Sequence, residues 1–476
     1  MVRLLAAATA STLALLAGAA AASGAEIGAN DDSAKYQADG GAAMYGQMAA
    51  LGLRRVVIGV RFRPSEPIVI QDKPLLDRAV AGALAAGLDV VFAVYPYPPR
   101  ELEAGLGSPS LFGSYAAALA SVYPGVRQFV IGNEPNQPAF WRPQFDAAGQ
   151  NVSAASFGGY LAAAYDALKA VDPSLEVLGA GLSPRGNDRP RARSNVSTSP
   201  VRFLRALGAW YRRSGRTLPL MDGFSFHPYP NRATDPLERG YAWPNAGFAN
   251  LDRLKQALWD AFQGTAQPTT LEGLRLHLDE VGWQVDTTGL PGYAGRENVP
   301  VTDELTQATI YSELVRRAAC DPDVASLSFF GFRDDGLRTG FQAALQRLDG
   351  SPRPAAAAVA AAIAETAAGC PGTLVRWQPA AAVLGARVDV RPAGTRRVVA
   401  RVSAGEDARV RVCVRPPGSE QQLRCRGSAV RGGRPATVGV PAPAGARRHV
   451  EVAVELRAEA NETRRSRIVR LASLRG

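Results

Sequence analysis

The 476-residue sequence has few of the residues that usually bind metals: four cysteines and three histidines, His227, His277 and His449. None of them shows the short Cys and His spacing of a zinc site, so we expect no catalytic zinc. No Gly-x-Ser-x-Gly segment occurs, which argues against a serine esterase. No glycine-rich phosphate turn follows the first expected strand, which disfavours a dinucleotide-binding sheet. We therefore expect neither a metal nor a cofactor.

Long apolar runs are also missing after the N-terminus, and a membrane span would need about 18 or more consecutive apolar residues. The first 25 residues combine Arg3, an apolar stretch from Leu4 to Leu16, and small residues that offer cleavage after Ala22 or Ala25. This pattern is typical of a secretory signal peptide. We expect a protein that is secreted or associated with the cell envelope, without a transmembrane span in the mature chain. An uncleaved N-terminal anchor is the alternative.

The four cysteines suggest disulfide bonds in an exported chain. Cys413 and Cys425 flank a Pro-Pro-Gly turn signal, which favours a bond across a β-hairpin. Cys320 and Cys370 each end a helical stretch and would pair if those helices are neighbours. We favour these two pairs, but the sequence leaves three connectivities open and also allows free thiols.

Lysine is nearly absent, so arginine supplies almost all of the positive charge. Residues 372–476 hold 21 Arg and 8 acidic residues, a net charge of +13, whereas residues 1–371 hold 33 basic and 35 acidic residues, a net charge of −2. An anionic cell-wall polymer is therefore a possible partner of the C-terminal segment. Compositional drift that fills exposed strand faces with Arg is the simpler explanation. Nucleic acid is the least favoured partner.

Short apolar runs alternate with longer amphipathic ones between residues 26 and 371. Eight runs resemble strands, at 26–30, 55–62, 89–98, 127–134, 176–184, 221–230, 274–283 and 324–332. Segments with helical spacing follow them, such as the apolar stripe formed by Phe157, Leu161, Ala164, Leu168 and Val171. Near-continuously apolar strands, each followed by a helix, are typical of the (β/α)8 or TIM barrel of the α/β class. An open doubly wound sheet is the competing architecture.

The period of the pattern changes to two from about residue 372, with Arg at alternate positions of short stretches such as "ARVRVCVRP". Such strands have one apolar and one solvent-facing side. We therefore expect residues 372–476 to form a small all-β sandwich after the barrel.

Two carboxylates stand at the predicted C-terminal ends of barrel strands. Glu134 ends the fourth strand in "FVIGNEPN", and Glu280 ends the seventh in "LHLDEVGW". These strands lie across the mouth of a barrel from each other, at the end where active sites form. Two facing carboxyl groups, one protonated and one ionised, can cleave a glycosidic bond without a cofactor.

The segments "GNEPN", "FHPYP" and "DEVGW", in this order on strands four, six and seven, resemble motifs of the clan A retaining glycoside hydrolases. This (β/α)8 group includes cellulases and β-xylosidases, and the resemblance covers most of residues 26–370. It implies that Glu134 is the acid/base, that Glu280 is the nucleophile, and that Asn133 bonds the sugar 2-hydroxyl. His227 and Tyr229 would line the same subsite, with Tyr229 bonding the nucleophile.

The resemblance also implies an arginine on strand two that steadies the nucleophile. Arg61 fits because it lies deeper in the predicted strand, but Arg63 shares its strand face and is the alternative. By the same alternation, His277 and Asp279 would point towards the helices if Glu280 points into the barrel mouth.

Aromatic side chains near the strand ends are candidates for stacking on sugar rings. We expect the cleft to use some of the following: Tyr95, Tyr97, Trp141, Trp243 and Trp283. Two features depart from the clan pattern. Phe330 and Phe332 stand where the clan commonly has a Trp at the end of strand eight, and Asp279 replaces the usual small or hydroxyl residue before the nucleophile.

The sequence as a whole predicts a secreted retaining glycoside hydrolase that cleaves a polysaccharide or oligosaccharide by double displacement. A catalytically silent barrel that binds polysaccharide or attaches to the cell envelope is the alternative, and the missing Trp motivates it. Loop shape decides which sugar and linkage are recognised and whether the chain is cleaved internally or at its end, so the sequence does not specify these.

Overall fold

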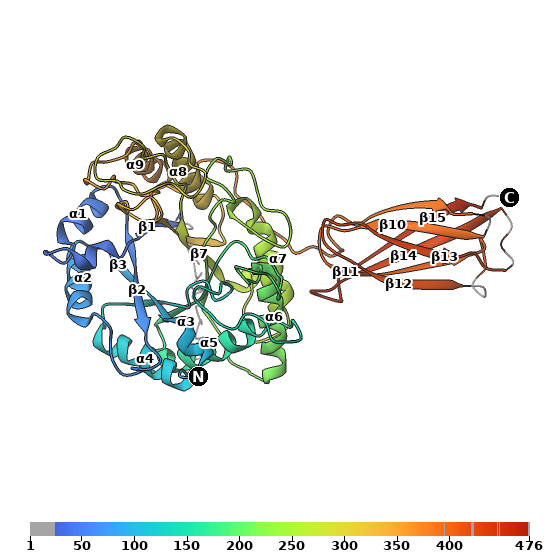
Figure 1. Cartoon of the computed structure of the whole chain (residues 1–476), viewed down its shortest axis with the longest axis horizontal. Coiled ribbons are helices and arrows are strands. Elements are labelled where there is room, and N and C mark those ends of the chain that lie inside the picture. Colours follow the sequence, from blue (N-terminus) through green and yellow to red (C-terminus); the bar gives the residue numbers. More distant parts are fainter. Residues whose placement is uncertain (1–23, 395, 420–422, 445, 447, 475–476) are drawn as a thin grey trace, which may run out of the picture.

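The computed structural model describes residues 24–394, 396–419, 423–444, 446 and 448–474 (Figure 1). The expected signal peptide lies outside the described residues except for its last two. Within the described part of the chain, every helix is too short or too polar to span a bilayer.

The predicted (β/α)8 barrel is confirmed. Eight parallel strands pair in chain order, and the last pairs with the first to close the barrel. They are β1 (Glu26–Asn30), β2 (Arg55–Phe62), β3 (Asp89–Pro96), β4 (Gln128–Ile131), β5 (Glu176–Leu182), β6 (Gly223–Phe226), β7 (Arg275–Val281) and β8 (Val324–Phe330). Figure 1 shows the surrounding helices, which are α1 (Ala42–Ala50), α2 (Lys73–Ala85), α3 (Pro99–Glu103), α4 (Pro109–Val122), α5 (Ser153–Val171), α6 (Pro200–Ser214), α7 (Leu251–Phe262), α8 (Glu304–Ala319) and α9 (Pro354–Thr366).

The strands are apolar because helices cover their outer face and other strands cover their inner face. Outside, Phe92 of β3 and Phe129 of β4 are fully buried and meet edge to face, with ring centroids 6.0 Å apart. Inside, a small apolar layer is formed by Val57, Val91, Ala93, Val130 and Leu178. Burial on both sides explains the near-continuous apolar runs from which the strands were predicted.

The predicted orientation of His277 and Asp279 was wrong, because both lie inside the barrel. Arg55 of β2 reaches across the interior, with Nη2 3.4 Å from Asp279 Oδ1 and Nη1 3.5 Å from His277 Nδ1. The cause is an irregularity in β7, whose register against β8 shifts between Leu278 and Val281. An extra residue in one strand breaks the alternation of side chains. Strict alternation of side chains along the strand therefore fails at Asp279, the residue before the predicted nucleophile.

The C-terminal segment forms two antiparallel sheets, as predicted for an all-β sandwich. One sheet has the order β13-β10-β9 and the other β12-β11-β14-β15. The strands are β9 (Arg387–Pro392), β10 (Arg397–Ser403), β11 (Ala408–Arg415), β12 (Arg424–Val430), β13 (Ala436–Pro441), β14 (His449–Ala458) and β15 (Arg465–Ser473). Alternate valines, such as Val410 and Val412 of β11, fill a core between the sheets. The period of two therefore reflects one buried and one exposed side of each sheet.

Both favoured disulfides are present. Cys320 follows α8 and bonds Cys370, which follows α9, and these two helices pack together. Cys413 and Cys425 are directly opposite residues of β11 and β12 and form the second bond.

A buried arginine joins the sheets to the barrel. The side chain of Arg464 is 1% exposed and lies between Asp260 of α7 and Glu406 of the turn after β10. Its Nη2 is 2.7 Å from Asp260 Oδ2, and its Nη1 donates to Glu406 Oε1 at 2.7 Å. A more exposed pair, Arg205 of α6 with Glu459, lies 2.9 Å apart at the same junction. The sheets therefore dock on the outer side of α6 and α7, as Figure 1 shows.

Candidate active site

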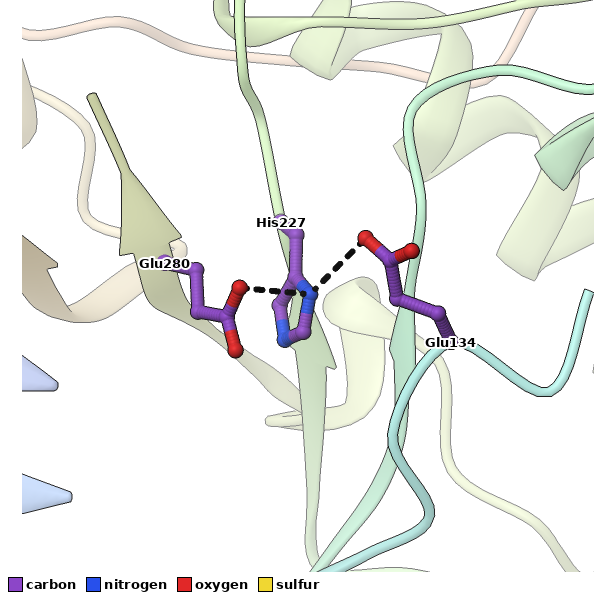
Figure 2. Close-up of side chains that lie close together, drawn as sticks. All are labelled: Glu134, His227 and Glu280. Atoms are coloured by element: carbon purple, nitrogen blue, oxygen red, sulfur yellow. Dashed lines mark hydrogen bonds and ion pairs between the residues drawn. The ribbon is translucent and has the colours of Figure 1, made fainter. Parts of the chain in front are cut away.

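Four of the predicted side chains meet at the C-terminal ends of the barrel strands. His227 Nδ1 lies 3.3 Å from Glu134 Oε1 and 3.4 Å from Glu280 Oε2, so the imidazole stands between the two carboxylates (Figure 2). The hydroxyl of Tyr229 donates a hydrogen bond to Glu280 Oε2 at 3.0 Å. Glu134 follows β4, His227 and Tyr229 follow β6, and Glu280 is the last residue but one of β7. All four therefore lie at the end of the barrel where active sites form.

Glu134 occupies a strained turn. β4 ends at Ile131, earlier than predicted, because Gly132 has a φ of 98° and turns the chain out of the strand. Glu134 itself has a φ of 43°, a left-handed conformation that costs a residue other than glycine about 1–3 kcal/mol. Its N–H donates to the carbonyl of Gly181 at 2.8 Å, and its carbonyl accepts from the N–H of Gln137 at 2.8 Å. These bonds hold the carboxylate in place against the strain.

Asn136 braces the same turn, although the sequence analysis did not single it out. It is fully buried, and its Nδ2 donates to the carbonyls of Ser183 at 3.1 Å and Thr198 at 2.9 Å. Its Oδ1 accepts from the N–H of Ser183 at 2.9 Å. The turn that carries Glu134 is thereby fixed to the loop after β5. The residue stands inside the quoted motif, but a single sequence does not reveal that its amide is buried.

Asn30 is a second residue that the sequence analysis missed. It is the last residue of β1, and its Nδ2 donates to Glu280 Oε1 at 3.2 Å and to the carbonyl of Asp279 at 3.3 Å. Glu280 therefore accepts one hydrogen bond at each carboxylate oxygen, from Asn30 and from Tyr229. The available signal was its place as a polar residue at a strand end.

Burial and neighbouring charges shift the pKa values of Glu280, His227 and Tyr229. Burial raises the pKa of Glu280 to about 7, with the charge of His227 opposing and that of Glu134 adding to the shift. Burial alone would lower the pKa of His227, but the charges of Glu280 and Glu134 outweigh it and raise that pKa. Burial, followed by the charge of Glu280, raises the pKa of Tyr229 well above its usual value. Tyr229 is therefore a hydroxyl donor at neutral pH, where the protonation of Glu280 changes.

This arrangement has two chemical uses. Glu134, His227 and Glu280 are the one group in the described residues whose metal-ligand atoms all lie within 4.8 Å of one another. An imidazole with two carboxylates is a suitable ligand set for a divalent transition metal. The same closeness of two carboxyl groups suits retaining glycosidic cleavage, in which they stand about 5–5.5 Å apart and no metal takes part.

Arg61 is not brought to Glu280 by any hydrogen bond or ion pair among the described residues. Its guanidinium lies over the ring of Tyr97, 5.0 Å from the centroid, and a hydrogen bond with Tyr95 raises the pKa of Arg61. Arg63, the alternative, is paired with Glu66 at 3.1 Å. The role of the strand-two arginine therefore stays a prediction without a direct contact to the carboxylate.

Tyr95 and Asn133 lie near the carboxylates. Tyr95 is partly buried; burial chiefly raises its pKa, and the charge of Glu280 adds to the shift. The ring of Tyr95 also meets that of Phe140 edge to face at 6.1 Å. Asn133 is partly exposed and directly precedes Glu134. Both are accessible in part to a ligand.

Two of the three predicted tryptophans lie in the core. Trp141 is 2% exposed and packs against Phe157 and Tyr160, with ring centroids 5.5 and 5.1 Å away. Trp283 is also 2% exposed, and its Nε1 donates to the carbonyl of Asp235 at 3.1 Å. Other side chains cover both rings, which leaves no open face for a sugar. The expectation that they line the cleft therefore does not hold in this structure, because loop residues after a strand can turn into the core.

Other aromatic rings surround Tyr229 instead. Phe330 at the end of β8 and Phe341 in the following loop pack against each other at 5.2 Å, and their rings lie 6.2 and 5.3 Å from that of Tyr229. Phe341 is 38% exposed. An aromatic surface is therefore present on the Glu280 side of the site, although it contains no Trp.

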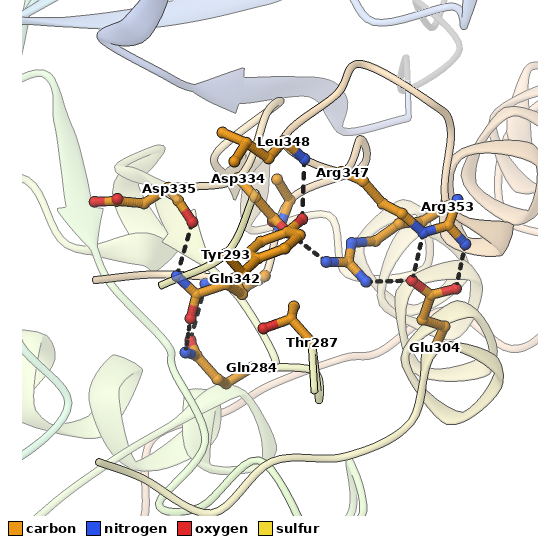
Figure 3. Close-up of polar contacts among 12 residues, drawn as sticks. Gln284, Thr287, Tyr293, Glu304, Asp334, Asp335, Gln342, Arg347, Leu348 and Arg353 are labelled. Atoms are coloured by element: carbon orange, nitrogen blue, oxygen red, sulfur yellow. Dashed lines mark hydrogen bonds and ion pairs between the residues drawn. The ribbon is translucent and has the colours of Figure 1, made fainter. Parts of the chain in front are cut away.

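A polar network joins the loops that follow β7 and β8 (Figure 3). Arg353 is fully buried, pairs with Asp334, and lies 2.5 Å from Glu304 Oε1 at the start of α8. Glu304 also accepts from Arg347 Nε at 2.9 Å, and the hydroxyl of Tyr293 donates to Asp334 Oδ2 at 2.7 Å. These bonds fix the two loops to each other on the Glu280 side of the barrel mouth.

No family model and no curated protein matches this sequence. Among solved structures, the chain is similar to a family 39 glycoside hydrolase from Bacteroides cellulosilyticus WH2, with 15% identity over 88% of this chain and 81% of that one and a TM-score of 0.48. It is also similar to a glucosidase from Croceicoccus marinus, with 13% identity, coverage of 83% and 88% and a TM-score of 0.45. A third is xylanase 10B from Thermotoga maritima, with 13% identity, coverage of 72% and 95% and a TM-score of 0.41. At these identities the similarity concerns the course of the chain and does not extend to an activity.

Proposed function

We propose that this protein is a retaining glycoside hydrolase that acts on a polysaccharide or oligosaccharide. One observation carries the proposal: carboxylate oxygens of Glu134 and Glu280 lie within 4.8 Å of each other at the C-terminal end of the barrel. The two carboxyl groups stand about 5–5.5 Å apart in double displacement and about 6.5–9.5 Å apart in inverting enzymes, which admit a water molecule between them. The close approach of one oxygen from each residue therefore supports double displacement.

Each residue then has a defined part in the reaction. Glu280 attacks the anomeric carbon, and the bond from that carbon to the leaving oxygen breaks as Glu134 donates its proton to this oxygen. Glu134, now ionised, takes a proton from water, and the hydroxide attacks the same carbon and releases Glu280. Tyr229 and Asn30 hold Glu280 by hydrogen bonds, and His227 lies between the two carboxylates.

The nucleophile is tested by replacing Glu280 with Ala and adding azide. Turnover of an aryl glycoside should be lost and partly restored by azide, which gives a glycosyl azide of inverted configuration. A retaining-enzyme activity-based probe should label Glu280 in the parent protein. Labelling of another carboxylate, or a product of inverted configuration from the parent protein, would overturn the mechanism.

The acid/base is tested with Glu134→Ala and two leaving groups. Hydrolysis of an alkyl or sugar leaving group should fall by about 10²–10⁴-fold, because general acid catalysis contributes that much. Formation of the glycosyl-enzyme from a dinitrophenyl glycoside should change little, since this leaving group needs no proton. Equal losses with both substrates would remove Glu134 from this role.

A silent polysaccharide-binding barrel is the second candidate. Phe330, where a Trp is common in the clan, and the raised pKa of Glu280 favour it, because a neutral Glu280 cannot attack. A panel of aryl glycosides and plant, fungal and bacterial polysaccharides separates the candidates. Saturable binding without any turnover would favour the silent barrel.

We also infer that the protein is exported, because a signal-like N-terminus precedes a barrel and sheets that each carry a disulfide. Secretion of a tagged full-length chain, with loss of residues 1–25 read by mass spectrometry, tests this. Attachment of the Arg-rich sheets to an anionic wall polymer is a separate prediction.

A further inference from the structure

The loop between β5 and α6 concentrates positive charge on the catalytic side of the barrel. Its segment 185–193, "RGNDRPRAR", contains four arginines, Arg185, Arg189, Arg191 and Arg193, and all four are exposed. Residues 1–371 as a whole carry a net charge of −2. A cluster of four arginines is therefore unusual in the barrel, whose positive and negative charges nearly balance. The C-terminal sheets, in contrast, are rich in arginine throughout.

These arginines have no carboxylate partners among the described residues. Asp188 is the one acid of the segment, and it is already engaged. Its Oδ2 lies 3.0 Å from Arg202 Nη1, and its Oδ1 accepts from the N–H of Ser199 at 2.8 Å. The four positive charges therefore remain available to an external anion.

Three of the four arginines line an open hollow. The hollow has a volume of about 900 Å³ and is formed by residues 187–195 together with Ala148 and Gly149 of the loop after β4. A methyl group at Gly149 would lie 3.2 Å from Pro190, so the two loops meet there. Arg189, Arg191 and Arg193 all belong to its lining.

The loop is braced, so the arginines project from a defined backbone. Asn187 Nδ2 donates to the carbonyl of Asn195 at 2.6 Å, and the N–H of Asp188 donates to the carbonyl of Ser197 at 2.9 Å. The N–H of Gly186 donates to Asn245 Oδ1 at 2.9 Å. A preordered loop loses less conformational entropy when it binds a ligand.

The hollow lies on the Glu134 side of the site. One of its loops begins directly after β4 and carries Glu134, and the other begins after β5. The two are joined three residues after Glu134, because Gln137 donates to the carbonyl of Arg185. Since the acid/base protonates the leaving oxygen, the group that departs extends towards this side.

We infer that the arginine hollow is a leaving-group subsite for an anionic saccharide, one that carries a carboxylate or a sulfate group. Guanidinium groups bind both anions through paired hydrogen bonds. This inference rests on the proposed function for its orientation, since it assigns the anionic residue to the part of the substrate beyond the cleaved bond.

Binding is measured on the full chain with Glu280→Gln, which prevents turnover. The probes are tetrasaccharides of polygalacturonate, which carry carboxylates alone, of heparin, which add sulfate, and of cellulose and xylan, which are neutral. Calorimetry should give at least about tenfold tighter binding of one acidic probe than of both neutral ones, with weakening as salt rises. The acidic probe that binds identifies the anion.

The variant R189A/R191A/R193A should lose about tenfold or more in affinity for that acidic probe and keep its affinity for the neutral probes. The matched control is R54A/R78A/R213A, which removes three exposed arginines of the barrel that lie outside this loop. It should leave all affinities unchanged. Equal thermal unfolding of the two triple variants checks that both are folded.

The outcomes separate this inference from the proposed function. Cleavage of neutral glycans, with no acidic preference and no effect of the loop variant, would overturn the subsite and keep the glycosidase. Loop-dependent binding of an acidic probe by a protein that cleaves no glycoside would keep the anionic site and overturn the glycosidase. Equal loop-dependent binding of single-stranded DNA or phosphatidylglycerol vesicles, or no binding of any acidic probe, would overturn the inference.

Discussion

The hydroxyl of Tyr229 donates a hydrogen bond to Glu280 at a distance of 3.0 Å, and this contact links the loop after β6 to the end of β7. A hydrogen bond to a charged group contributes about 1.5–3 kcal/mol. Tyr229→Phe should therefore lower the rate constant of glycosyl-enzyme formation by roughly tenfold to a hundredfold. Pre-steady-state burst kinetics on a dinitrophenyl glycoside measure that step. An unchanged burst rate would show that the contact is not used in the attack.

The raised pKa of Glu280 predicts the acid limb of the pH profile. The nucleophile must be ionised, and its pKa is about 7 because of burial. The kcat/KM of the parent protein should therefore fall as pH drops below about 7, since this parameter reports groups of the free enzyme. Replacing Tyr229 by Phe removes one hydrogen bond that lowers this pKa, so the acid limb should move to higher pH.

The same shift predicts a pH dependence of stability. The folded state binds the Glu280 proton more tightly than the unfolded state, whose pKa is near 4.5, so the stabilisation is complete below about 4.5 and lost as pH rises through about 7. At pH 8 the ionised group costs up to roughly 3 kcal/mol, at about 1.4 kcal/mol per pKa unit, and less because its side chain is 14% exposed. Glu280→Gln should raise Tm at pH 8 and change it little at pH 4. An equal effect at both pH values would contradict the shift.

Metal removal distinguishes the two chemical uses of the cluster. If the carboxylates cleave glycosides directly, exhaustive treatment with EDTA should leave kcat and KM unchanged. Added Zn²⁺ should inhibit, because Glu134, His227 and Glu280 present ligand atoms within 4.8 Å of one another. His227→Ala should reduce this inhibition. Loss of activity with EDTA and recovery with a divalent metal would instead identify a metalloenzyme.

Arg353 predicts a large effect on stability at a distance from the reacting groups. It is fully buried between Glu304 and Asp334. Breaking a buried ion pair by removing one partner costs about 3–5 kcal/mol, since the other charge stays buried and unpaired. Arg353→Ala should therefore lower the free energy of unfolding by that amount in urea titrations. Arg391→Ala, which breaks an ion pair whose partner Asp389 is also exposed, is the control and should cost under about 1 kcal/mol.

The sequence predicted the barrel and the two carboxylates because both depend on local signals. Apolar runs identify strands that are buried on two faces, and strand ends identify the active face. Side-chain direction was predicted less well. Trp141 and Trp283 follow strands just as Glu134 does, but their side chains turn into the core, and only tertiary packing decides this. The bulge in β7 similarly placed His277 inside the barrel.

Arg464 makes the barrel and the sheets depend on each other for stability. Its charge is compensated by Asp260 from one unit and Glu406 from the other, and burial raises the pKa of Asp260 although Arg464 opposes the shift. If the sheets unfolded alone, Asp260 of the barrel would lose its charged partner. If the barrel unfolded alone, Arg464 would keep its pair with Glu406 but lose its bonds to Asp260. Heating should therefore produce one cooperative transition for the whole chain. The sheets act as part of the folding unit, and a barrel expressed without them should melt at a lower temperature.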